Sequence, residues 1–221
     1  MVKVRIWDLP TRLFHGALAL AVLGLVITGQ TGGDAMVWHF RLGYAVFTLL
    51  LFRLCWGWVG GHWSRWRQLP LSWHSLQAYR QGLATPTLTA GHNPAGSWSV
   101  LAMLAWLALQ VATGLVSDDE IANAGPLSSL VSGAAVSAAT AWHQGLGKGI
   151  LLALILLHVG AVLWYKFRKT QDLLPAMLHG DKLLAQDVPA SRDDARTRVL
   201  AILVALLCAL AVRWVIALGS P

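Results

Sequence analysis

Residues 141–169, AWHQGLGKGILLALILLHVGAVLWYKFRK, contain an apolar run long enough to cross a bilayer, and this run carries two histidines. His143 lies near its start and His158 lies deep inside it. A spanning helix needs roughly 20 mostly apolar residues. An ionisable side chain in hydrocarbon is costly and usually serves a function. The two imidazoles are therefore expected to serve a function and to constrain how the helices pack.

The composition is that of an integral membrane protein. The 221 residues are 56% hydrophobic and only 12% charged, with a mean hydropathy of +0.58, which is too apolar for a soluble domain of this length. Because the long apolar runs are continuous rather than alternating, they predict helices and not barrel strands. Five stretches are long enough to span, at about 13–30, 42–60, 97–116, 143–165 and 199–218.

Two features of the sequence could indicate a secreted protein or an iron–sulfur protein, but the predicted spans explain both. The first apolar stretch follows a basic segment, as in a signal peptide, but it has no small-x-small cleavage site, so we expect a retained helix. Cys55 and Cys208 lie inside different predicted spans without a CxxC-like spacing, so neither a disulfide nor an iron–sulfur site is expected.

The net charge of +7 is an orientation signal. Basic residues gather in segments 1–12, 61–96 and 166–198, whereas the connections QTGGDAMVW and SDDEIANAGPLSSLVSGAAVSAATAW contain no Lys or Arg. By the positive-inside rule, the three basic segments and the N-terminus are cytoplasmic and the C-terminus is periplasmic. We expect a multi-pass protein of the bacterial inner membrane that does not bind nucleic acid.

Four histidines fall at two depths in this topology. His15 and His158 lie in the cytoplasmic halves of the first and fourth spans, and His39 and His143 lie at the outer ends of the second and fourth. In one continuous helix, fifteen residues turn about 60° past four full turns and rise roughly 22 Å. His143 and His158 would then project from nearly one face at two levels.

Paired imidazoles at two levels favour haem over zinc. A haem iron takes two axial ligands from opposite sides, and imidazole binds transition metals well. Zinc would need four ligands at one point, often including a carboxylate or thiolate, and no acidic residue lies in these spans. The sequence therefore predicts two bis-histidine haems, with pairs His15/His158 and His39/His143.

Glycines and cations near these histidines have two interpretations each. The glycines allow a close approach to a macrocycle, but ordinary helix packing explains them better. Cations can neutralise haem propionates or extend towards the lipid headgroups, and both readings stay open. The nearest cations are Arg41 and Lys148 for the outer haem, and Arg12 and Arg53 for the inner one.

Four segments carry a family resemblance. WDLPTRLFHGALALAVLGLVITG, WHFRLGYAVFTLLLFRLCWGWVG, GHNPAGSWSVLAMLAWLALQVATGLVSDD and WHQGLGKGILLALILLHVGAVLWYKFRK resemble the four core helices of prokaryotic cytochrome b561 proteins. This group is related to the b-type cytochrome subunits of nickel–iron hydrogenases and formate dehydrogenase. The resemblance covers about residues 5–180.

The resemblance implies an all-α, integral membrane, four-helix di-haem bundle, here followed by a fifth C-terminal transmembrane helix. The implied organisation is a di-haem core over 1–175, a cytoplasmic linker over 176–198 and a fifth helix over 199–221. It implies two haem b groups on the same two histidine pairs, and it places His92 of GHNP near the inner haem or a quinone. The two histidines of the fourth helix are usually fourteen residues apart in the family, one fewer than here. We expect a π-bulge or a non-helical start in HQGLGKG, which its glycines permit, to absorb the extra residue and to affect the placement of His143.

Two haems at two depths suggest electron transfer between the quinone pool and a periplasmic redox partner, such as a cytochrome c. One alternative is a superoxide:quinone oxidoreductase, which would need a cationic funnel made by residues such as Arg41, Lys148 and Arg213. Another is a membrane-anchor cytochrome b subunit of a hydrogenase-like or cytochrome c complex. A histidine proton relay in a transporter is disfavoured because no acidic residue lies near the midplane.

Overall fold

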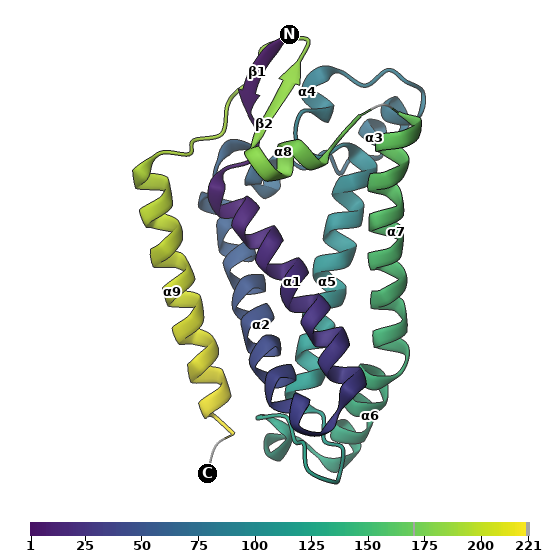
Figure 1. Cartoon of the computed structure of the whole chain (residues 1–221), viewed down its shortest axis with the longest axis vertical. Coiled ribbons are helices and arrows are strands. Elements are labelled where there is room, and N and C mark those ends of the chain that lie inside the picture. The colour runs from purple at the N-terminus through teal and green to yellow at the C-terminus, as the bar shows by residue number, and fades with distance from the viewer. Residues whose placement is uncertain (170, 220–221) are drawn as a thin grey trace. The chain divides into compact units, whose positions relative to one another are not determined.

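The computed structural model describes residues 1–169 and 171–219, and the chain is mostly helical (Figure 1). Five candidate membrane-spanning segments are present among these residues, as expected for a membrane helical bundle. Four long helices have the bounds α1 Leu9–Thr31, α2 Met36–Val59, α5 Pro94–Val116 and α9 Ala195–Ala217. The remaining segment consists of α6 Gly133–Gln144 and α7 Leu146–Arg168.

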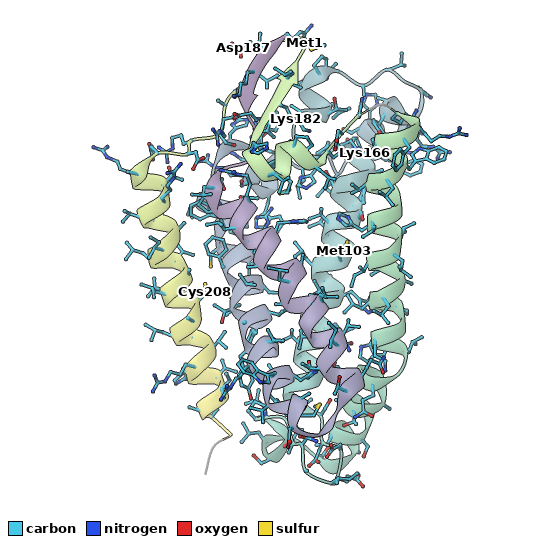
Figure 2. The ribbon with its side chains drawn as sticks, viewed as in Figure 1. Met1, Met103, Lys166, Lys182, Asp187 and Cys208 are labelled. Carbon is cyan, nitrogen blue, oxygen red and sulfur yellow. The ribbon has the colours of Figure 1, made fainter. Side chains whose placement is uncertain are left out.

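The predicted spans are found at their expected places, and the fourth is interrupted within HQGLGKG, the stretch expected to absorb the extra residue between its histidines. The fourth span is not one continuous helix, because the helical geometry is interrupted at Gly145, where φ is −101° and ψ is −111°. His143 therefore ends α6, whereas His158 lies on α7. Cys55 lies in α2 and Cys208, which is labelled in Figure 2, lies in α9. No disulfide is found in the described part of the chain.

The long helices expose apolar side chains that would be unfavourable in water. Leu20 of α1, Leu156 of α7 and Leu207 of α9 are 72%, 72% and 66% exposed. Large exposed apolar areas are rare on soluble proteins but are the normal lipid-facing surface of a membrane protein. These faces support membrane insertion independently of hydropathy.

Short elements connect the long helices. They are β1 Val2–Arg5, η1 Gly33–Ala35, η2 His62–Ser64, η3 Trp66–Gln68, α3 Trp73–Arg80, α4 Pro86–Thr89, η4 Ser128–Leu130, α8 Leu174–His179 and β2 Asp181–Leu184. The segment expected to be a linker, 176–198, overlaps α8 and the start of α9 and contains β2. β2 pairs antiparallel with β1, with Val2 opposite Leu184 and Arg5 opposite Asp181 (Figure 1).

The chain divides into two compact units. The first comprises Met1–His15, Arg53–Ala102 and Leu157–Val204, and the second comprises Gly16–Phe52, Met103–Leu156 and Ala205–Pro221. The first unit has its own apolar cluster beside the β-ribbon. The cluster consists of Val4, Ile6, Trp7, Trp63, Ala90, Ala176 and Val188.

Asp8 is the buried polar centre of the first unit and determines where α1 begins. Its carboxylate is 0% exposed and accepts from the backbone N–H of Thr11, three residues on, at 2.8 Å, as an N-cap does. It also accepts from Trp56 Nε1 at 3.2 Å, Gly61 N at 2.9 Å and Ser64 Oγ at 2.8 Å. One carboxylate therefore joins the start of α1 to the end of α2 and to η2.

Asp193 joins the polypeptide before α9 to the same region. It forms ion pairs with Arg5 at 3.1 Å, Arg12 at 3.7 Å and Arg198 at 3.2 Å. Its Oδ1 also accepts from the backbone N–H of Leu9 at 3.2 Å. A charge shared among several hydrogen-bonded partners contributes more than an isolated surface pair.

Lys182 of β2 supports the turn that precedes α5 (Figure 2). Its Nζ donates to the carbonyls of Ala90 at 2.7 Å and Gly91 at 3.2 Å. Burial lowers the pKa of Lys182 to about 8, because removing an ammonium from water disfavours its charged form. The β-ribbon thereby holds the segment that carries His92.

This pKa shift predicts a pH-dependent stability. Between pH 8 and about 10.4, unfolded Lys182 binds a proton that the folded form lacks, so the free energy of unfolding should rise with pH. Lys182→Met should remove a rise on the order of 1–3 kcal/mol in thermal unfolding experiments in detergent. Lys3→Met is the matched control, since Lys3 is 71% exposed. Equal pH slopes for wild type and Lys182→Met would contradict the assignment.

Candidate metal-binding sites

His39 and His143 face each other in the second unit. Their ring centres are 6.2 Å apart and their planes are 89° apart. His39 Nδ1 lies 3.1 Å from the Leu25 carbonyl, and His143 Nδ1 lies 2.9 Å from the Gln110 carbonyl. Since a carbonyl only accepts, each Nδ1 is the protonated nitrogen and each Nε2 carries the lone pair. This is the tautomer of a metal-binding imidazole held by a backbone carbonyl.

His15 and His158 form a second pair in the first unit. Their ring centres are 6.3 Å apart and the interplanar angle is 51°. His15 lies on α1 and His158 on α7, and both are half-buried. The structure thus brings together the histidines that depth alone pairs.

The ring separations distinguish a direct contact from a shared metal. Two imidazoles joined by an in-line hydrogen bond have ring centres about 5.2 Å apart, with ~1.15 Å from each ring nitrogen to its centre. With metal–nitrogen bonds of about 2.0 Å on opposite sides of one ion, the separation becomes about 6.3 Å. The observed 6.3 Å and 6.2 Å fit the second arrangement. Across the described residues there is no group of three or more His, Cys, Asp or Glu suited to a metal.

Glycines make room for the imidazoles of the second unit. A Cβ on Gly29 would lie 3.0 Å from His39 Cε1, and a Cβ on Gly114 would lie 2.8 Å from His143 Cε1. Gly43, one turn after His39, is half-buried, and a Cβ there would meet no atom within 4 Å. Two glycines therefore seat the rings, and a third borders open space on the His39 face.

Arg53 and His92 lie near the His15–His158 pair. Arg53 is 5% exposed, and its guanidinium stacks on Trp66 at 4.1 Å. His92 contacts Trp7 edge-on at 4.7 Å and lies within electrostatic reach of Arg53, His15 and His158. Among the residues described, six buried side-chain nitrogen or oxygen atoms have no hydrogen-bond partner, and two of them, Arg53 Nη1 and His92 Nδ1, lie near this pair. Buried polar atoms without a partner need an explanation, and for these two an anionic group is one, provided that His92 Nδ1 carries the proton.

The other predicted cations are placed differently. Arg12 Nη1 donates to the Leu178 carbonyl at 2.7 Å, and Arg12 also joins the Asp193 network. Arg41 is exposed and stacks on Trp38 at 5.0 Å. Lys148 is exposed, and its charge acts on His143. Arg53 is therefore the predicted cation that is most deeply buried.

Gln110 is a site residue that the sequence analysis missed. Its backbone carbonyl accepts from His143 Nδ1, and its side chain donates to the His143 carbonyl at 2.7 Å. An amide in the middle of the apolar α5 was a signal, because polar groups in hydrocarbon are costly and usually face a partner.

Comparison with known proteins agrees with this geometry. The family described as prokaryotic cytochrome b561 matches residues 6–180. The chain belongs to this family. That confirms the resemblance and indicates a membrane b-type cytochrome with a role in electron transfer.

Three relatives carry the name probable Ni/Fe-hydrogenase B-type cytochrome subunit. Those of Azotobacter chroococcum mcd 1 and Azotobacter vinelandii are each 24% identical over 84% of this cytochrome and 91% of the relative. That of Bradyrhizobium diazoefficiens is 21% identical over 81% of this cytochrome and 85% of the relative. No solved structure matches.

The close contact between Gly114 and the His143 ring predicts that a side chain at position 114 lowers the free energy of unfolding. Gly114→Ala should lower stability by about 1–3 kcal/mol, because its Cβ would overlap the imidazole. Gly149→Ala meets no atom within 4 Å and should be neutral or stabilising by up to ~1 kcal/mol. Thermal unfolding of both variants in detergent measures the difference. Equal midpoints would show that Gly114 does not seat the ring.

Proposed function

We propose that this cytochrome transfers electrons across the membrane through two b-type haems held by His15/His158 and His39/His143. The electrons would connect the quinone pool with a redox partner on the periplasmic side. The observation that carries the proposal is the pair of ring separations, 6.3 Å and 6.2 Å, each fitting two imidazoles on one iron. Haem supplies reversible one-electron chemistry when bound.

The chain's own residues would hold and tune each group. The Leu25 and Gln110 carbonyls, by accepting from the two Nδ1–H groups, orient the rings of His39 and His143 and make them more basic. Gly29 and Gly114 keep these rings close to the neighbouring helices. At the other site, His15 and His158 would be the two ligands of the inner haem.

Arg53 and His92 would anchor the propionates of the inner haem. Each has a buried nitrogen without a partner in the described structure, and an anionic carboxylate would satisfy both. For the outer haem, Lys148 and Arg41 are the corresponding cations, and Arg12 is a further candidate at the inner site.

The inner bacterial membrane, with the N-terminus in the cytoplasm, completes the proposal. The exposed apolar helices and the distribution of basic residues support it. The core would be the four helical segments up to about residue 175, and α9 would be an additional fifth helix. The relatives' names support an electron-transfer subunit that serves a hydrogenase-like partner.

Asp119 of the acidic stretch SDDE accepts hydrogen bonds within its own loop. Asp119 Oδ1 accepts from the backbone N–H groups of Ile121, Ala122 and Asn123. These hydrogen bonds, together with one from Asn123 Nδ2 to Oδ2, hold the pKa of Asp119 well below its usual range. We therefore assign Asp119 to loop structure rather than to partner docking.

Haem stoichiometry tests the proposal. A pyridine haemochrome assay against protein concentration should give two b-type haems per chain. His158→Ala and His39→Ala should each remove one haem, because each leaves one imidazole without its partner. His74→Ala is an exposed control and should retain both. Unchanged haem content in both ligand variants would overturn the assignment.

The role of Arg53 can be tested by potentiometry. Replacing a buried cation by Met should retain haem but lower the midpoint potential of the inner one by roughly 30–60 mV, because a nearby positive charge favours the reduced iron. Arg67→Met is the matched control on an exposed arginine. If both variants leave both potentials unchanged, Arg53 does not act on the haem.

A further inference from the structure

The break at Gly145 separates two helices that must both be held in place. The hydrogen bonds across it run from Gly145 N to Ala141 O at 3.0 Å and from Gly149 N to Gly145 O at 3.1 Å. A Cβ on Gly145 would lie 2.6 Å from Ala141 O, so only glycine fits. A helix end in hydrocarbon leaves carbonyls that need donors from elsewhere.

Gln110 of α5 supplies such a donor at the end of α6, and Trp106 of α5 adds a hydrogen bond to the first turn of α7. Gln110 Nε2 donates to the His143 carbonyl at 2.7 Å, and Trp106 Nε1 donates to the Gly147 carbonyl at 2.9 Å. These acceptors lie two residues before and two residues after Gly145. Helix α5 therefore bridges the break from outside.

The same stripe of α5 also positions the imidazole. Trp106, Gln110 and Gly114 follow each other at intervals of four residues and so share one helix face. The Gln110 carbonyl accepts from His143 Nδ1 at 2.9 Å, and bare Gly114 lies against the ring. Gln110 thus binds both the ring and the backbone of His143.

We infer that Gln110 is the positioning residue that makes the interrupted helix compatible with a haem ligand at His143. The side-chain amide of Gln110 holds the backbone of His143 at the break. This contact fixes the distance between the backbone carbonyl of Gln110 and the imidazole ring of His143. This inference rests on the proposed function, because it assumes that His143 binds haem.

Gln110→Met tests the inference, since Met has a similar volume but no donor. We expect the low-temperature EPR signal of the outer haem to shift and haem loss from that site to become about tenfold faster. The inner haem is an internal control in the same protein. Thr48→Val is the matched control variant, because Thr48 Oγ1 donates to the Tyr44 carbonyl within its own helix α2, and it should leave both haems unchanged.

A milder variant covers the case in which Gln110→Met does not fold. Trp106→Phe keeps an aromatic ring against Trp142, 5.3 Å away, and removes the donor to Gly147. It should shift the EPR signal of the outer haem in the same direction by a smaller amount. An outer haem that is unchanged in spectrum and retention in the folded variants would overturn the inference.

Failure of the inference can be distinguished from failure of the proposed function. If His143→Ala removes one haem but Gln110→Met changes neither its EPR signal nor its retention, His143 is a ligand and Gln110 does not position it. If His143→Ala retains both haems, the ligand assignment itself is wrong.

Discussion

An imidazole placed in hydrocarbon must find a partner for each of its nitrogens, and this constraint organises the chain. At His39 and His143, the Nδ1–H groups donate to the carbonyls of Leu25 and Gln110. The second nitrogen keeps its lone pair, and the facing ring lies at the separation expected for a shared metal. Because each imidazole needs these partners in lipid, the helices that supply them pack at defined positions.

Glycine and glutamine permit this arrangement for different reasons. Because Gly29 and Gly114 have no side chain, the rings of His39 and His143 lie closer to the helix backbone than a residue with a Cβ would allow. Gly145 lets the helix end directly after His143, which leaves backbone groups without helical partners. Gln110 then offsets that cost, since its amide donates to the exposed carbonyl.

The first unit depends on a buried carboxylate with several hydrogen-bond donors. Asp8 has four donors and fixes the start of α1, the helix that carries His15. Arg53 and His92 differ from Asp8, because each has a buried nitrogen without a partner in the described residues. Both lie near the His15–His158 pair, and this position makes a ligand there a reason for their unpaired nitrogens.

The membrane class, the five spans, the four histidines that the structure brings together in pairs, and the glycines that permit the break at Gly145 can all be read from the sequence. Hydropathy and the helical period act along the chain, so these features need no distant partner. That the pairs bind haem stays a prediction. The contact between Gln110 and His143 across 33 residues and the pairing of β1 with β2 appear only in the tertiary structure. These depend on groups far apart in the chain, whose hydrogen bonds no local pattern specifies.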